Sequence, residues 1–60
     1  MRWFKFEVLG RVKTHAVEAE TVADAKEQAD GQSGGSSNWY GMREISQRAY
    51  LSLVNSWWGR

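Results

Sequence analysis

The side chains that could carry out chemistry are few and scattered along this chain. His15 is the single histidine, and none of the 60 residues is a cysteine. A zinc site needs three or four nitrogen, sulfur or oxygen ligands, so one imidazole among scattered carboxylates is a poor ligand set. Glu18 and Glu20 would share one face of a strand, as a general acid–base pair can, but the sequence around them offers no nucleophile. The sequence therefore predicts a non-enzymatic protein with no metal site and no cofactor.

Glycine and serine are concentrated in residues 31–38, GQSGGSSN. A loop that binds phosphate through its backbone amides would follow a strand and lead into Gly-Lys-Ser or Gly-Lys-Thr. No such tripeptide follows these residues, and no strongly strand-like segment precedes them. The segment therefore predicts a flexible loop, and we expect no small-molecule substrate.

A hairpin face that combines an aromatic ring with basic side chains can bind single-stranded nucleic acid by stacking and phosphate contact. On the hairpin expected here, Trp3, Lys5, Lys13 and His15 project together, with Arg11 at the tip. The chain is weakly basic, however, with eight Lys and Arg against seven Asp and Glu. Nucleic-acid binders usually carry a larger basic excess. Binding of nucleic acid through this face is therefore the alternative function.

Most of the large apolar side chains lie in residues 39–58, including three of the four tryptophans. In a helix, one apolar stripe would contain Met42, Ile45, Ala49, Leu53 and Trp57, and a second stripe would contain Leu51, Val54 and Trp58. The apolar arc would span about 240°, against the roughly 100° of a helix that covers one surface. A 60-residue domain cannot cover both stripes, because it buries only about 60% of its unfolded surface.

The leading function is therefore a small protein–protein interaction module. Tryptophan and arginine dominate the energetics of many interfaces, and the chain ends in SWWGR. We expect the contact to a protein partner, or to a second copy of this chain, to use Leu51, Val54, Trp57 and Trp58. A homodimer is the simplest form, because two-fold pairing buries the same stripe on both copies.

The elements that must position these residues begin with a β-hairpin over residues 2–20. WFKFEV alternates apolar and polar side chains, and Gly10 marks the turn. A three-residue loop would pair Val8 with Val12, Phe6 with Thr14 and Phe4 with Ala16, and would set Glu7 opposite Lys13 and Arg2 opposite Glu18. This register predicts that Phe4, Phe6, Val8 and Val12 face the core, while Trp3, Lys5 and Lys13 face outward.

A short helix is expected over residues 22–30. Thr21 is a suitable N-cap, and Asp24 lies three residues later, as the acidic residue of a capping box does. Val22, Ala25 and Ala29 form a narrow apolar stripe, and Gly31 is a natural stop. Residues 42–47 fit either a helix or a third strand, whereas residues 49–58 favour a helix. The predicted fold is a single α+β domain, a ββα unit followed by a C-terminal helix or strand–helix.

The hairpin followed by VEAETVADAKEQAD resembles a pattern of small phage-encoded α+β proteins, including phage inhibitors of bacterial RNA polymerase. The resemblance covers about residues 2–30 and consists of the order strand, turn, strand and capped helix. It implies an accessory or inhibitor protein that occupies the surface of a host macromolecule, and it carries over no functional residue. The sequence contains no run of about 18 apolar residues that would span a membrane, so we expect a cytoplasmic location.

Overall fold

The chain folds in the order β1 (Arg2–Val8), β2 (Thr14–Ala19), α1 (Val22–Ser33), β3 (Trp39–Ile45) and α2 (Gln47–Trp58). The computed structural model describes residues 1–58, and for residues 57–58 it describes the backbone alone. The predicted α+β fold is confirmed, since three antiparallel strands combine with two helices. Of the two alternatives for residues 42–47, the strand is correct as far as Ile45, and α2 follows it.

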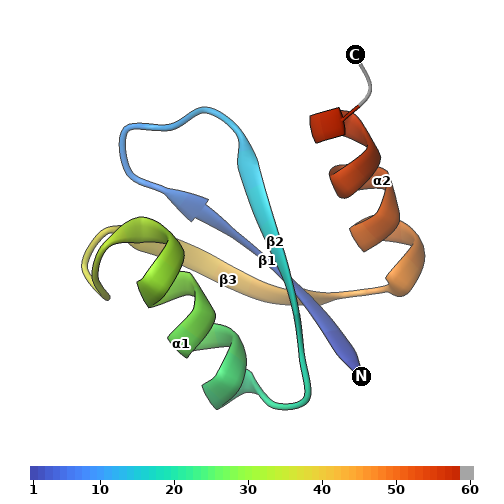
Figure 1. Ribbon diagram of the computed structural model, residues 1–60, viewed down its shortest axis with the longest axis horizontal. Helices are drawn as coiled ribbons and strands as arrows, with labels where there is room; N and C mark the ends of the chain where they lie inside the picture. The colour runs from blue at the N-terminus through green and yellow to red at the C-terminus, as the bar shows by residue number, and fades with distance from the viewer. Residues whose placement is uncertain (59–60) are drawn as a thin grey trace.

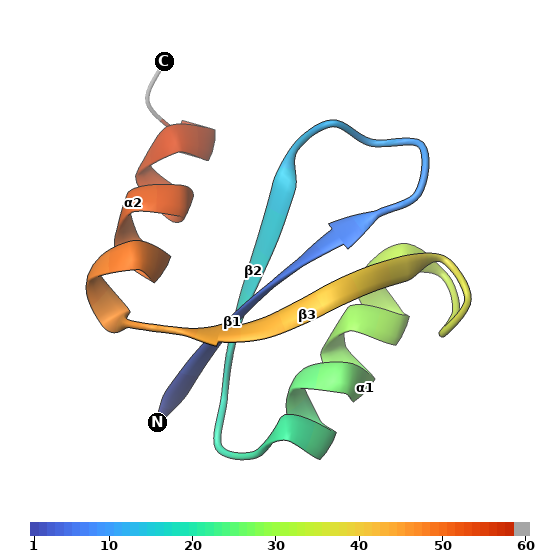
Figure 2. The same ribbon diagram turned by 180° about the vertical axis from the view of Figure 1, so that it is seen from behind.

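The sheet has the order β2-β1-β3, so β1 is its central strand. Figure 1 shows α1 on one side of the strands and α2 on the other, and Figure 2 shows the same arrangement from behind. Helix α1 contacts all three strands, whereas α2 contacts β1 and β2. The two faces of the sheet are therefore called the α1 face and the α2 face below.

The main core lies between the sheet and α1. It contains Phe4, Phe6, Val8, Val17, Ala19, Ala25 and Ala29, with Trp39 and Met42 packed against it. Phe4 and Phe6 are the largest fully buried side chains. Both core residues of α1 are alanines, so the helix backbone lies close to the sheet but buries little side-chain area of its own. The prediction that Phe4, Phe6 and Val8 face the core is confirmed.

The predicted hairpin register is wrong by one residue. β1 pairs with β2 so that Phe4 lies opposite Val17, Phe6 opposite His15 and Glu7 opposite Thr14. Because side chains alternate between faces, this slip moves Val17 and Ala19 into the core and turns Ala16 toward α2. The observed register buries Val17 beside Phe4, whereas the predicted one would have turned Val17 out of that core.

The turn of the hairpin also differs from the predicted three-residue loop. The N–H of Arg11 donates to the carbonyl of Val8 at 3.0 Å, and Gly10 has a φ of 80°. Gly10 therefore occupies the third position of a four-residue turn, where a positive φ favours glycine. Val12 and Lys13 extend the loop beyond this turn, and Val12 is fully exposed rather than in the core as predicted.

Helix α1 begins at the predicted residue, Val22, and ends at Ser33, three residues beyond the predicted end. The hydroxyl of Thr21 accepts a hydrogen bond from the backbone N–H of Asp24 at 3.1 Å, which confirms the N-cap. Gly31 does not stop the helix, because the αL cap is Gly34, whose N–H donates to the carbonyl of Asp30. The predicted helix end at residue 30 and the predicted loop start at residue 31 are therefore wrong.

The connection that remains, residues 34–38, is held by hydrogen bonds at both ends. The side-chain amide of Asn38 donates to the carbonyl of Ser33 at 3.0 Å. The carbonyl of Asn38 accepts from the N–H of Leu9 at 2.9 Å, which ties this connection to the end of β1. Asn38 thereby places Trp39 at the start of β3.

Strand β3 completes the sheet on the free edge of β1. Its pairing is interrupted by a bulge between Lys5 and Glu7 of β1, and Gly41 has a φ of 71° at that point. Gly41 therefore lies within a strand and not before a helix, as the helical alternative required. The extra residue lets Trp39 and Met42, three positions apart, share the α1 face, where both pack against the core.

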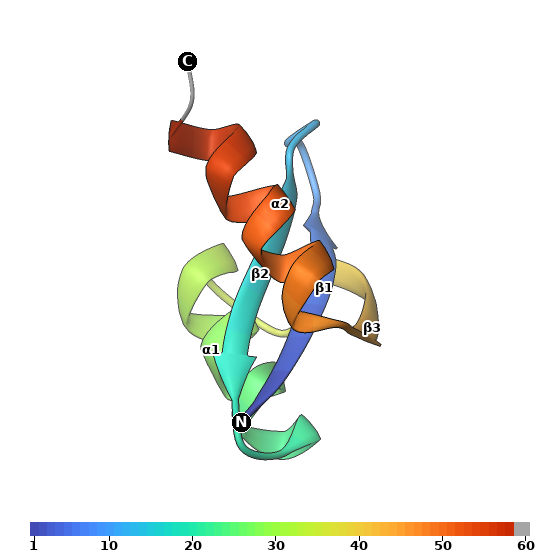
Figure 3. The same ribbon diagram turned by 90° about the vertical axis from the view of Figure 1, so that its right-hand side faces the viewer.

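Helix α2 begins directly after β3. The hydroxyl of Ser46 accepts a hydrogen bond from the backbone N–H of Ala49 at 3.1 Å, and its carbonyl accepts from Tyr50, so Ser46 is the N-cap. Figure 3 shows α2 turned toward the viewer, running across β1 and β2. Within the part of the chain that the structure describes, no helix is long and apolar enough to cross a membrane.

Candidate functional site

Helix α2 turns Ala49 and Leu53 toward the sheet, while Ser52 beside them is exposed. Ala49, Ser52 and Leu53 line an open pocket together with Lys5, Thr14 and Ile45 from the α2 face of the sheet. This pocket has a volume of about 290 Å³. It exists because an alanine and a serine lie where a helix that packed tightly on a sheet would carry larger residues.

Other large side chains of α2 are at least partly exposed. Leu51 is 49% exposed, and Tyr50 and Val54 are partly exposed. We call Leu51, Val54 and Trp58 the outer stripe, because they occupy positions i, i+3 and i+7 of α2. The side chains of Trp57 and Trp58 lie outside the described residues, so the description of the predicted contact surface ends with Leu51 and Val54.

The outer stripe is almost uncharged. Arg48, in the first turn, is the single charged residue of α2. At about 100° per residue, Arg48 lies roughly 60° around the helix from Leu51 and about 120° from Val54. A surface of this kind offers apolar area but no charged group that would select a charged partner.

The residues of the predicted nucleic-acid face are divided between different parts of the molecule. Trp3 and Lys5 share the α2 face of β1 and are partly buried. Arg11 and Lys13 lie exposed in the loop between β1 and β2. The five predicted residues therefore do not form one continuous face, because the fifth, His15, lies on the other side of the sheet.

The position of His15 corrects the sequence prediction. The one-residue change in register turns its imidazole onto the α1 face, opposite Phe6. The two rings stack with centroids 5.5 Å apart and planes 24° apart. His15 therefore packs as an aromatic residue at the border of the core and does not lie beside Lys5.

Charged side chains elsewhere form a local pair. Arg2 donates from Nη2 and Nε to the two carboxylate oxygens of Glu44, at 2.8 and 3.0 Å. These hydrogen bonds lower the pKa of Glu44 below its ordinary value. The Arg2 guanidinium also lies over the ring of Phe4, 5.4 Å from its centroid. The pair joins β1 to β3, so its role is to hold these two strands of the sheet together.

The described residues do not form a candidate metal site. Within residues 1–58, no three His, Asp or Glu side chains come together in a group that could hold an ion. Glu18 is exposed on β2, and Glu20 is exposed directly after the end of that strand. The features that could act in recognition are thus the outer stripe of α2 and the pocket beneath it.

The comparison with known proteins adds no assignment. Neither a protein-family model, nor a curated protein, nor a solved structure matches this chain.

Sequence reasoning did not find the pocket. Its lining residues Thr14, Ile45, Ala49 and Ser52 come from three different elements, and their meeting depends on the hairpin register and on the position of α2. One local signal was present. Ala49 and Ser52 lie three positions apart in a helix otherwise rich in large apolar residues, a spacing that leaves space on one helix side.

Proposed function

We propose that this chain is a small non-enzymatic protein–protein interaction domain that self-associates through the outer stripe of α2. The observation that carries the proposal is the orientation of this helix. Ala49 and Leu53 face the sheet, while Leu51 is left 49% exposed. Burial of apolar area contributes about 25 cal/mol per Å², so a second copy that covered Leu51 would add stabilisation that the isolated domain lacks.

The small size of the core supports self-association. Among the described residues eight apolar side chains are buried, and half of them are alanines. An alanine contributes little transfer free energy compared with a leucine or phenylalanine. A second copy packed on α2 would extend this core, and the free energy of association would stabilise the fold of each copy.

A second copy also fits the stripe in shape and charge. Leu51 and Val54 lie near the middle of the 12-residue helix, so antiparallel pairing of two α2 helices would bring each stripe onto its counterpart. The stripe carries no charge that would repel its own copy. Because α2 is about 18 Å long, the contact is small, and we expect association in the micromolar range.

The test is the oligomeric state as a function of protein concentration. Sedimentation equilibrium from about 1 µM to about 500 µM should show a monomer–dimer equilibrium for the unmodified chain. Leu51→Glu should weaken association at least tenfold, because a carboxylate would be buried without a partner. Leu51→Ser together with Trp58→Ser should also weaken it, while the amide spectrum of the hairpin remains unchanged.

The matched control is Val12→Glu, which introduces the same charge at an exposed apolar residue in the β1–β2 loop. This variant should associate like the unmodified chain. A chain that stays monomeric over the whole concentration range would contradict the proposal. Equal weakening by Val12→Glu and Leu51→Glu would also contradict it, because association would then not depend on α2.

A further inference from the structure

We propose that the pocket between α2 and the sheet binds a small amphipathic carboxylate, a medium-length apolar chain with an anionic head. Six residues line the pocket: Lys5, Thr14, Ile45, Ala49, Ser52 and Leu53. Its volume of about 290 Å³ lies just below the usual range for ligand sites, which runs from about 300 to 1,000 Å³. The volume therefore selects a ligand of few atoms.

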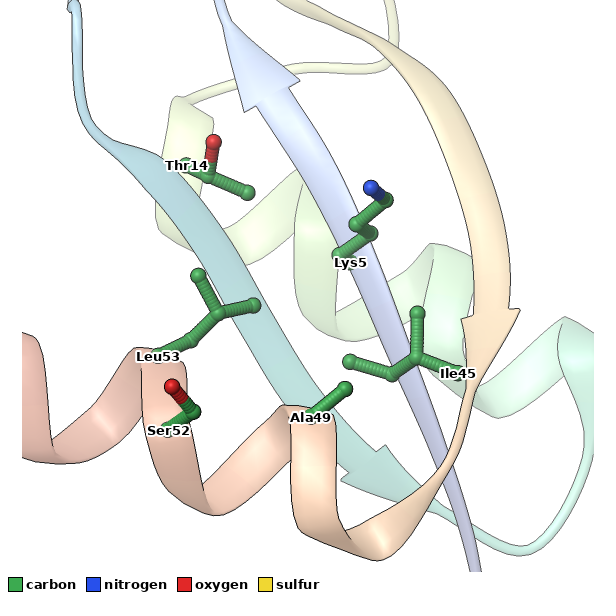
Figure 4. Close-up of a pocket in the computed structure, with 6 residues that line it drawn as sticks. All are labelled: Lys5, Thr14, Ile45, Ala49, Ser52 and Leu53. Carbon is green, nitrogen blue, oxygen red and sulfur yellow. The ribbon is translucent and has the colours of Figure 1, made fainter.

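The lining is divided into an apolar and a polar part. Figure 4 shows Ile45, Ala49 and Leu53 around one end of the pocket, with the ammonium of Lys5 and the hydroxyl of Thr14 toward the other. The three apolar side chains come from β3 and α2, and Lys5 and Thr14 come from β1 and β2. The third polar residue, Ser52 of α2, lies beside Ala49 and Leu53 and is exposed (Figure 4). An apolar chain at the first end would thus place its head group near the second.

The charge at the polar end favours an anion. Lys5 is partly buried, and no carboxylate among the described side chains forms an ion pair with its ammonium. Its neighbour across the β1–β3 pairing is Arg43, a second cation. Glu7, the nearest acidic residue along the same face of β1, accepts a hydrogen bond from Thr14 at 3.0 Å.

A carboxylate at this end would neutralise a partly desolvated ammonium. Hydrogen bonds in which both groups are charged are about twice as strong as neutral ones, so the head group should matter measurably for affinity. The apolar end would provide burial for a chain, and the hydroxyl of Ser52 is the one polar group of the lining there. The pocket thus distinguishes an amphipathic anion both from an inorganic anion and from a neutral alcohol.

The test is an NMR titration with octanoate below its micelle concentration. The amide signals of Lys5, Ile45 and Leu53 should shift and saturate together, with one dissociation constant. Octanol should bind the unmodified chain about tenfold more weakly than octanoate does, and inorganic phosphate should leave the signals of Ile45 and Leu53 in place. This comparison needs no variant, so it does not depend on whether a substituted chain folds.

Two variants locate the site. Lys5→Met should weaken octanoate binding about tenfold and leave octanol binding unchanged, whereas the control Lys13→Met removes an exposed cation outside the pocket and should change neither. Ala49→Leu should weaken both ligands, because it fills the apolar end. Three outcomes would each overturn the proposal. They are equal affinity of the chain for octanoate and octanol, octanoate shifts that do not saturate, and unchanged octanoate binding by Lys5→Met. None of these outcomes depends on the oligomeric state.

Discussion

The indole Nε1 of Trp39 donates a hydrogen bond to Oδ1 of Asp30 across 2.7 Å. This bond joins the last turn of α1 to the first residue of β3. The same indole meets the ring of Phe6 edge-on, with centroids 5.8 Å apart and planes at 67°. Trp39 therefore links the start of β3 to α1 by a polar contact and to β1 by an apolar one.

Removing this hydrogen bond should destabilise the domain. A double-mutant cycle with Asp30→Ala and Trp39→Phe should give a coupling free energy of roughly 1.5 kcal/mol, because the acceptor is charged and partly buried. Urea denaturation measures it. The control cycle pairs Trp39→Phe with Glu27→Ala, an exposed acidic residue of the same helix, and should give no coupling. Equal coupling in the two cycles would show that the bond does not stabilise the fold.

Engineered cysteines should report the hairpin register, since the chain has none of its own. Glu7 lies opposite Thr14, and facing Cβ atoms on paired strands are about 4.5–5.5 Å apart, near the reach of a disulfide. Glu7→Cys with Thr14→Cys should close under mild oxidation, as mass spectrometry would show. Glu7→Cys with Lys13→Cys tests the alternative register and should stay mostly reduced. Preferential closure of the second pair would contradict the observed pairing.

Two glycines should respond to alanine with opposite signs. Gly31 lies inside α1, and no heavy atom lies within 4 Å of the place where its Cβ would sit, so Gly31→Ala should stabilise the domain by about 0.5–1 kcal/mol. Gly41 has a φ of 71° at the bulge, so Gly41→Ala should cost about 1–2 kcal/mol. Thermal unfolding measures both. A stabilising Gly41→Ala would exclude the left-handed bulge.

The Arg2–Glu44 pair should make a small, pH-dependent contribution. Its hydrogen bonds lower the pKa of Glu44 in the folded state, so the stabilisation is present above the ordinary pKa of glutamate and disappears as the pH falls through the lowered value. Arg2→Met should raise the pKa of Glu44 toward its ordinary value in an NMR titration. Lys26→Met removes an exposed cation from α1 and should leave that pKa in place. An unchanged pKa in Arg2→Met would exclude the pair in solution.

Local physics accounts for the parts that could be predicted from the sequence. Alternation sufficed to place Phe4, Phe6 and Val8 on one face of β1, because the period of a strand is two whatever its partner. The N-cap at Thr21 was predictable because its hydroxyl bonds an amide three residues away. Each of these features depends on residues that are neighbours in the chain.

Contacts between distant segments produced the rest. The register depends on burying Val17 and Ala19 against α1, so the charge pairs expected from the hairpin alone did not decide it. Helix α1 runs through Gly31 because Gly34 provides the C-cap. Beside this cap, the side-chain amide of Asn38 donates a hydrogen bond to the carbonyl of Ser33. Glycine costs only about 1 kcal/mol inside a helix, and capping and tertiary contacts can exceed that amount.

Residues 39–45 show most directly the difference between what local sequence determines and what contacts between distant segments determine. Its apolar spacing fits a helix, and Met42 and Ile45 would then have shared a stripe with Ala49 and Leu53. In the folded chain, β1 has an open edge whose backbone groups need partners, and Trp39 and Met42 fill the space beside Phe6. A residue pattern cannot encode that open edge, because the edge exists only after the hairpin has formed. The pocket under α2 likewise exists only after folding, because its lining residues come from four separate elements.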